Sequence, residues 1–150
     1  LFIPNFSIGS VLGTAFAALA ARFFDSIEIV EAHHSGKVDS PSGTAVRTAE
    51  LIGAARGDAG PVSAPHADQR ARGQLVSGVP VHSLRLSGVL AEQQVILGGD
   101  GETLTVSHST ISPSAYEQGI LLALRRAPEA KGVVVGLDAL LDLGLPGTTE

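Results

Sequence analysis

Residues 31–44 read EAHHSGKVDSPSGT and follow a stretch whose alternating isoleucines predict a β-strand. The strand expected over residues 26–32 delivers His33 and His34 at its C-terminal end, where adjacent side chains point to opposite faces. Ser40-Pro41 then predicts the start of a helix, because Ser is a favoured N-cap and Pro suits the first turn. The stretch therefore combines side chains that donate protons with free backbone N–H groups that bind anions.

Hydrophobic spacing predicts the other elements. Apolar residues at i, i+4, i+7 and i+11 from Leu12 predict a helix over residues 8–24. Further helices are expected over residues 41–57 and 112–128. Further strands are expected over residues 79–86, 93–97 and 102–108. A hairpin turn is expected at residues 98–101 and a long loop at residues 57–78. This order predicts an α+β fold in which helices cover one face of an open sheet and the other face needs a partner.

Composition limits the classes of protein. The chain has 150 residues, of which 44% are hydrophobic and 17% charged, so it is long and apolar enough to form one domain with a core. A net charge of -5 without a basic run indicates neither nucleic-acid nor membrane-surface binding. The absence of cysteine is compatible with a reducing cytoplasm. The chain has no Met and no G-x-G-x-x-G after a predicted strand, so we interpret it as a piece of a longer protein.

The segment after the predicted strand holds the candidate catalytic and binding residues. Taken alone, adjacent histidines at a strand end are more often ordinary surface residues. Lys37, with a reference pKa of ~10.4, is either a solvated loop residue or a charge anchor and proton donor. Gly43 and Thr44 either only start a helix or also let a ligand approach the backbone.

The remaining polar residues favour structural roles. Asp39 favours a cap or a turn, and His82, Arg85 and His108, on predicted strands, favour packing in the core or an interface over the site. No histidine spacing matches a metal-binding motif, so no metal is expected.

The quoted stretch resembles the E-(L/A)-H-H-x-x-K-x-D-(A/S)-P-S-G-T-A signature of the 4-hydroxy-tetrahydrodipicolinate reductase (dihydrodipicolinate reductase) family of diaminopimelate and lysine biosynthesis. The resemblance extends in order over almost the whole chain, through Pro4-Gly9, Arg72-Gly73, Val79-His82, Arg85, Gly136-Leu137 and Leu140-Leu143. One departure is Gly36, which stands where many relatives have a third histidine.

The resemblance implies a role for each candidate residue. His33 would be the acid/base catalyst, assisted by Lys37. His34, Lys37, Gly43 and Thr44 would bind the substrate. The cofactor, NADH or NADPH, would touch this chain through Ile3, Pro4, Asn5 and Phe6.

The resemblance also implies an architecture. Residues 1–128 would form a substrate-binding and tetramerisation domain, a mixed four-stranded sheet whose uncovered face pairs within a homo-tetramer. Residues 129–150 would be a tail returning to a nucleotide-binding domain that this chain lacks. The whole enzyme, expected in the cytoplasm, would reduce a cyclic dicarboxylate, 4-hydroxy-tetrahydrodipicolinate, to tetrahydrodipicolinate, and this chain alone would be inactive.

Two alternatives remain open: a stand-alone oligomeric dicarboxylate-binding or scaffold domain without catalysis, and a purely structural assembly domain. A reading frame that continues upstream into a G-x-G-x-x-G unit would favour the reductase. The preference for NADH or NADPH depends on residues outside this sequence.

Overall fold

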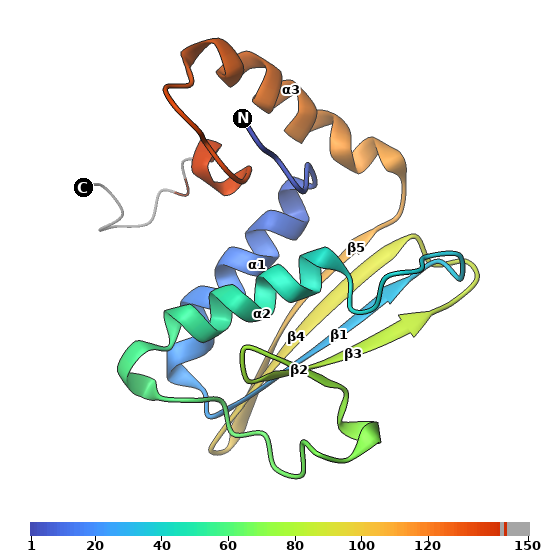
Figure 1. Ribbon diagram of the computed structural model, residues 1–150, viewed down its shortest axis with the longest axis vertical. Helices are drawn as coiled ribbons and strands as arrows, with labels where there is room; N and C mark the ends of the chain where they lie inside the picture. Colours follow the sequence, from blue (N-terminus) through green and yellow to red (C-terminus); the bar gives the residue numbers. More distant parts are fainter. Residues whose placement is uncertain (142, 144–150) are drawn as a thin grey trace.

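A computed structural model describes residues 1–141 and residue 143, and a five-stranded mixed sheet lies at its centre (Figure 1). The strand order is β2-β3-β1-β4-β5. The strands are β1 (Ser26–His33), β2 (Gln74–Val76), β3 (Val79–Arg85), β4 (Ala91–Gly99) and β5 (Glu102–Thr110). The central strand β1 runs parallel to β3 and antiparallel to β4, so its last residue, His33, lies between Arg85 and Ala91.

Helices cover one face of the sheet. The α-helices are α1 (Ile8–Ala20), α2 (Gly43–Ala55) and α3 (Glu117–Arg126). In Figure 1, α1 and α2 lie against one face of the sheet, and α3 lies away from it, near the start of the chain. Small residues allow this close packing, because Ala17 of α1, Ala45 and Ala49 of α2, and Ala21 in the 3-10 turn after α1 are all fully buried in the core.

The pleat of β1 determines which side chains reach the core. Ile27 and Ile29 are fully buried on the helix-covered face, whereas Glu28 and Val30, on the opposite face, are only partly buried. Burial of each isoleucine stabilises the fold by about 1.5–3 kcal/mol. The same alternation places Glu31 and His33 on the helix-covered face, two and four residues after Ile29.

The structure confirms the α+β fold and corrects three details of the sequence-based prediction. The sheet has five strands rather than four, because β2 pairs with β3 across a Ser77-Gly78 turn inside the segment expected to be a loop. The second helix has Ser42 as its N-cap, not Ser40. The helix predicted over residues 8–24 is an α-helix only to Ala20 and continues as a 3-10 turn over Ala21–Phe23, and the exposed fractions of Phe16, Leu19 and Phe23 are 48%, 50% and 69%.

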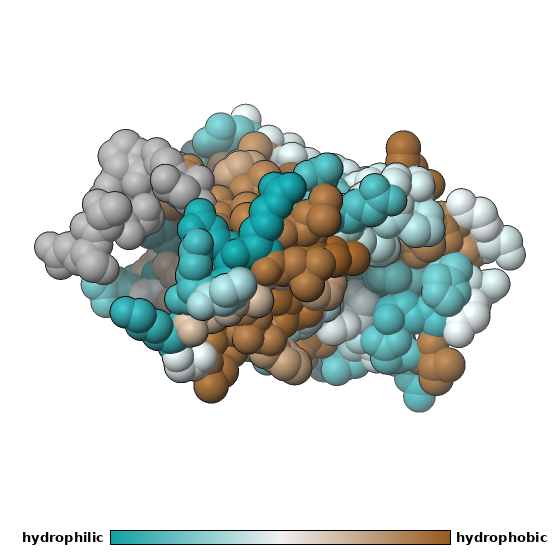
Figure 2. All heavy atoms as spheres, turned by 90° about the horizontal axis from the view of Figure 1, so that it is seen from above, coloured by the Kyte–Doolittle hydropathy of each residue, from teal (hydrophilic) through white to brown (hydrophobic). Residues whose placement is uncertain are grey.

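The two ends of the described chain meet. Phe2 pairs with Val135 in a parallel β-bridge, and Leu137 is buried beside Gly119 of α3. Figure 2, which views the molecule from the α3 end, shows apolar residues gathered across the middle of that side. The predicted tail, residues 129–150, is thus tied to the N-terminal segment through residue 135, while residues 142 and 144–150 lie outside the described part.

Two arginines fix the ends of the segment that links α2 to β2. Arg56 is buried, and its guanidinium donates hydrogen bonds to backbone carbonyls of two segments, one after α1 and one after α2. These acceptors are Ala21, Phe24, Ala59, Gly60 and Pro61. At the other end, the Arg72 guanidinium binds the Glu28 carboxylate on the uncovered sheet face, so the segment is held at both ends.

Candidate functional site

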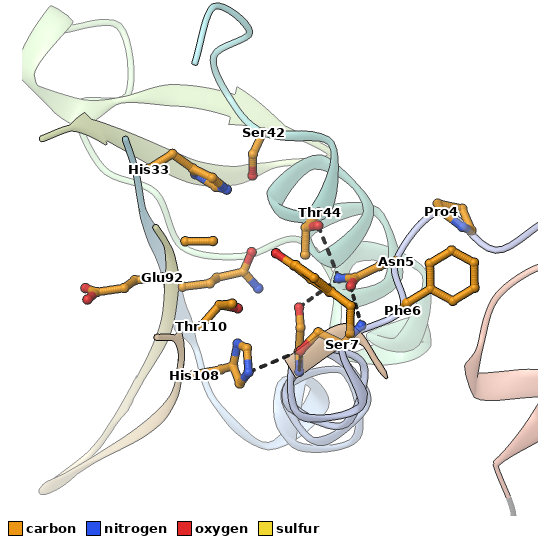
Figure 3. A pocket seen from close by; sticks show the side chains of 14 residues that line it. Pro4, Asn5, Phe6, Ser7, His33, Ser42, Thr44, Glu92, His108 and Thr110 are labelled. Carbon is orange, nitrogen blue, oxygen red and sulfur yellow. Dashed lines mark hydrogen bonds between the residues drawn. The ribbon is translucent and has the colours of Figure 1, made fainter. Parts of the chain in front are cut away.

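A cavity of about 350 Å³ lies where the C-terminal end of β1, the N-terminus of α2 and the segment before α1 meet (Figure 3). Strands β4 and β5 close its other side. The residues that line it are Pro4, Asn5, Phe6, Ser7, Ser10, His33, Ser42, Thr44, Ala91, Glu92, Gln93, His108, Thr110 and Tyr116. The lining is mainly polar, with two imidazoles and five serine or threonine hydroxyl groups that come from three separate regions of the chain (Figure 3).

His33 is held from behind by a buried carboxylate. Its Nδ1 atom lies 2.6 Å from Oε2 of Glu31, whose side chain is fully buried. The Arg85 guanidinium binds both oxygens of that carboxylate at 3.0 Å. We call Glu31, His33 and Arg85 the cavity cluster. Only its imidazole lines the cavity, and its other two members form a support behind the ring.

The Glu31 carboxylate is charged at neutral pH. Burial by itself raises the pKa of Glu31, but hydrogen bonds from Arg85, Ser83, His33 and the Ser42 backbone outweigh burial and lower the pKa overall. An ionised carboxylate only accepts hydrogen bonds, so the Nδ1 atom of His33 carries the proton in their contact.

The N-terminus of α2 opens on the cavity beside His33. Ser42 caps the helix, since its hydroxyl oxygen accepts from the Ala45 backbone at 3.2 Å. The next residue, Gly43, is exposed, and a Cβ atom added there would meet no other atom within 4 Å. The Thr44 side chain lines the cavity. The first turn therefore presents unpaired backbone N–H groups, a hydroxyl group and open space together, which suits a carboxylate ligand.

The segment before α1 is tied to α2 by an amide side chain. Asn5 donates to the hydroxyl groups of Ser10 at 2.9 Å and Thr44 at 3.4 Å, and it accepts from the Ser7 backbone (Figure 3). Pro4 and Phe6 flank it in the cavity wall. Three of the four predicted cofactor-contacting residues are thus in the same cavity as His33, and Ile3 is not among the lining residues.

His108 of β5 forms the wall opposite α2. Its Nε2 atom lies 3.3 Å from the Ser7 hydroxyl, and the ring packs so closely on α1 that a Cβ atom at Gly9 would lie 2.7 Å from it. Burial lowers the pKa of His108, which favours the neutral ring. Glu92, on the neighbouring strand, directs its carboxylate away from the other labelled side chains in Figure 3.

Three of the four predicted substrate-binding residues, His34, Lys37 and Gly43, are not among the residues that line the cavity. The Lys37 ammonium group is 2.7 Å from the Asp39 carboxylate, and this contact lowers the pKa of Asp39. His34 is exposed in the turn after β1, where its ring lies near Gly36. The structure therefore brings His33 and Thr44 together around the cavity and leaves His34 and Lys37 on the loop beside it.

The sequence interpretation gave no role to Glu31 or Ser42 and favoured packing for Arg85, His82 and His108. The structure places His108 in the cavity wall and Arg85 behind His33, whereas His82 lies on the uncovered face. Glu31 could have been found from strand alternation, because it shares the inward face with Ile29 and His33.

Residues 1–141 and 143 contain no group of three or more His, Cys, Asp or Glu side chains placed to hold a metal ion. No helix in that same part of the chain is long and apolar enough to cross a membrane.

The fold and the cavity define an α+β domain with a polar cavity in which the His33 imidazole lies beside the N-terminus of α2. Residues 9–141 match the family model described as "Dihydrodipicolinate reductase, C-terminus". The chain therefore belongs to the dihydrodipicolinate reductase family, as its C-terminal part.

Named relatives agree with this family. The chain is 69% identical over 143 residues to the 4-hydroxy-tetrahydrodipicolinate reductase of Clavibacter michiganensis, covering 95% of this chain and 52% of that protein. It is 54% identical over 147 residues to the enzyme of the same name from Streptomyces griseus, covering 95% and 59%. A dipicolinate-bound dihydrodipicolinate reductase from Paenisporosarcina sp. TG-14 has a TM-score of 0.81 at 39% identity, covering 93% of this chain and 53% of that one. The chain thus spans about half the length of these relatives.

Proposed function

We propose that this chain is the substrate-binding part of a 4-hydroxy-tetrahydrodipicolinate reductase, which reduces that cyclic dicarboxylate to tetrahydrodipicolinate with NADH or NADPH. The observation that carries the proposal is the meeting of His33 with the first turn of α2 in one cavity. A ring with two carboxylates needs both an anion-binding group and a proton donor, and this cavity supplies them side by side. The dipicolinate bound to the Paenisporosarcina relative is a ligand of this chemical class.

In this proposal, the backbone N–H groups at Gly43 and Thr44 and the Thr44 hydroxyl bind one carboxylate of the substrate. The helix dipole adds to their attraction. Gly43 keeps the approach open, because a side chain there would occupy the space in front of the helix end.

His33 delivers the proton that must accompany the hydride. Since Nδ1 of His33 donates to Glu31, its Nε2 atom is the one left to face the ligand, and the imidazolium form donates from that atom. The described residues make no hydrogen bond to Nε2 that would compete with the substrate.

NADH or NADPH fits this part of the protein only at its nicotinamide end. Pro4, Asn5 and Phe6 form a cavity wall that would contact a flat ring, while the single mixed sheet supplies no glycine-rich βαβ unit for the phosphates within the described residues. When bound, the cofactor supplies the hydride. The Asn5 amide holds the wall in place through Ser10 and Thr44.

Lys37 and His34 complete the proposed site. In the structure the Lys37 ammonium is paired with Asp39, so it would have to exchange that carboxylate for one of the substrate. Asp39 is mostly exposed, and an exposed ion pair contributes little to stability, so the exchange would meet little resistance.

The uncovered sheet face is the proposed contact of a homo-tetramer. Leu84 and Ile96 on this face are 44% and 37% exposed, next to partly buried Val30. Light scattering should show a tetramer, and a monomer at micromolar concentration would contradict the assembly. A stand-alone binding domain without catalysis would show the same assembly and ligand binding, but no reduction when joined to a nucleotide-binding half.

We also propose a cytoplasmic location, and this proposal rests on membership of the reductase family.

The direct test is titration calorimetry with pyridine-2,6-dicarboxylate. Wild type should bind, and Gly43→Ala should weaken binding about tenfold, the equivalent of about 1.4 kcal/mol, because its methyl group enters the open space at the helix end. Lys37→Ala should also weaken binding. Gly98→Ala is the matched control, since its Cβ atom would meet only Ser26 at an ordinary 3.8 Å and lies away from the cavity. No binding by wild type, or equal binding by Gly43→Ala and wild type, would refute the proposed site.

A further inference from the structure

We infer that Glu31 is a positioning residue that selects the ring tautomer of His33 and links the proton donor to the anion-binding helix end. This inference rests on the proposed function. Glu31 touches no ligand-facing surface: its side chain is fully buried and is not among the residues that line the cavity. Its effect on the reaction would therefore pass through the groups that it binds.

The two Glu31 oxygens accept four N–H groups. Oε2 accepts from His33 Nδ1 at 2.6 Å and from Arg85 Nη1 at 3.0 Å. Oε1 accepts from the Ser42 backbone at 3.2 Å and from Arg85 Nη2 at 3.0 Å. Arg85 and the Ser42 backbone can only donate, so the carboxylate is matched to a ring that donates from Nδ1.

The contact with Ser42 links two parts of the site. One carboxylate fixes both the imidazole and the N-cap residue of α2, whose hydroxyl oxygen in turn accepts from Ala45. Displacement of this carboxylate would therefore disturb the distance between the proton donor and the bound anion. A misplacement of about 1 Å is enough to lower a rate by about 10²-fold.

A carboxamide at this position gives a sharp test. If the –NH₂ group of Glu31→Gln took the place of Oε1, it would face two donors, Ser42 N–H and Arg85 Nη2–H. In the place of Oε2 it faces only one obligatory donor, Arg85 Nη1–H, because the imidazole can move its proton to Nε2 and accept at Nδ1. The variant should therefore choose the second orientation and reverse the His33 tautomer.

The chain contains a matched control. Glu28, on the other face of β1, accepts from His82 Nε2 at 2.6 Å and binds Arg72 through both oxygens. It repeats the chemistry of Glu31 away from the cavity. Glu28→Gln should leave the His33 tautomer unchanged, which separates a local effect of Glu31 from a general effect of losing a carboxylate on β1.

The experiment is two-bond ¹H–¹⁵N NMR of the labelled chain at a pH where histidines are neutral, with a His33→Gln variant to assign the signal. Wild type and Glu28→Gln should show the Nδ1–H form of His33, and Glu31→Gln the Nε2–H form. Glu31→Asp keeps an acceptor-only group and should keep the Nδ1–H form. The wild-type spectrum is a test by itself: a neutral His33 in the Nε2–H form overturns the inference even if every variant fails to fold.

Kinetics test the consequence in a chimaera of this chain with the N-terminal half of the Clavibacter michiganensis relative. Glu31→Gln should lower kcat by about 10- to 10³-fold through the wrong tautomer, with KM and dicarboxylate affinity changed less than about threefold, and Glu31→Asp should recover part of kcat. Equal losses in kcat and affinity without a change of tautomer would mean a merely structural role. If the wild-type chain did not bind dicarboxylate at all, the proposed function would fall, while the tautomer result would still be readable.

Discussion

Strand β1 carries two Glu–His–Arg clusters of nearly the same composition on its opposite faces. The cavity cluster joins Glu31 to His33 and Arg85, and the open-face cluster joins Glu28 to His82 and Arg72. In each cluster a carboxylate lies 2.6 Å from an imidazole nitrogen and binds a guanidinium through both oxygens. The exposed fraction of the carboxylate side chain is 0% in the first cluster and 32% in the second.

The difference lies in what surrounds each imidazole. His33 uses Nδ1 to bind its carboxylate and lines a cavity that also holds a helix N-terminus. His82 uses Nε2, and its other nitrogen lies only 3.0 Å from where a Cβ atom of Gly73 would be. The open-face cluster therefore fixes the end of a loop. The same three residue types leave a free side of the imidazole on a cavity only in the cavity cluster, which is why the proposed proton donor is His33 and not His82.

The largest expected difference concerns turnover. In the chimaera, His33→Gln should lower kcat by about 10²–10⁴-fold, as expected for loss of a general acid, whereas His82→Gln should change kcat by less than about threefold. His34→Ala should act mainly on KM, because His34 is exposed beside the cavity and is proposed only to contact substrate. Steady-state kinetics of the three variants checks this order. A larger loss of kcat for His34→Ala would exchange the roles of the neighbouring histidines.

The second difference concerns stability. Glu31→Ala leaves the Arg85 guanidinium, 19% exposed, without its carboxylate, which should lower the free energy of unfolding by about 3–5 kcal/mol. Glu28→Ala removes a partly exposed pair and should cost about 1 kcal/mol or less. Urea denaturation of both variants measures the two values. Equal losses would show that burial does not distinguish the clusters.

Acid should weaken the open-face cluster. The hydrogen bond from Arg72 lowers the pKa of Glu28, against a smaller opposing effect of burial and with help from His82. A carboxyl whose pKa is lower in the folded state adds stability above its unfolded pKa, about 4.5, and loses it as pH falls through the folded value. The free energy of unfolding should therefore fall below about pH 4.5, and less steeply in Glu28→Gln. An identical slope for both proteins would contradict the contribution of this pair.

The smallest effect is expected outside both clusters, at His108. Burial lowers the pKa of this ring, so protonation favours the unfolded chain. The contribution of the neutral His108 ring to the free energy of unfolding is complete above the unfolded pKa of about 6.5. It decreases as pH falls below that value. His108→Gln should flatten the stability curve in this range, because the group whose pKa differs between the folded and unfolded chain is removed. Thermal unfolding at closely spaced pH values would detect it, and an unchanged curve would contradict burial as the cause.

Much of the fold follows from local patterns in the sequence. β1 and the two helices that flank the sheet were predicted from hydrophobic spacing within a few residues of their ends, because apolar burial determines them. β2 was missed, since three residues give no alternation and its turn places Ser77, rather than Asn or Gly, at positive φ. The apolar spacing from Leu12 predicted α1 correctly but does not mark its buried side, because alanine, not phenylalanine, fills the space between this helix and the sheet.

Candidate residues of the site were predictable where they belong to a short motif, as at residues 4–6 and 33–44. His33 and Thr44 belong to one short motif, so both were found. Arg85 and His108 come from other strands, and only the pairing of His33 with Arg85 and of Gln93 with His108 brings them near. Strand registers of this kind depend on long-range packing, which a single sequence does not display.

The arginine clamps at the two ends of the segment between α2 and β2 have a practical consequence for labelling this protein. Arg56 holds the chain up to Pro61, and Arg72 holds it again on the sheet, so residues 64–70 form a largely exposed stretch between two fixed points. The entropy of closing a loop grows only slowly with its length, and none of residues 64–70 lines the cavity. A short fluorescent or affinity tag placed in this stretch should therefore leave the cavity undisturbed. The segment thus offers an attachment point for single-molecule measurements of ligand binding at the proposed site.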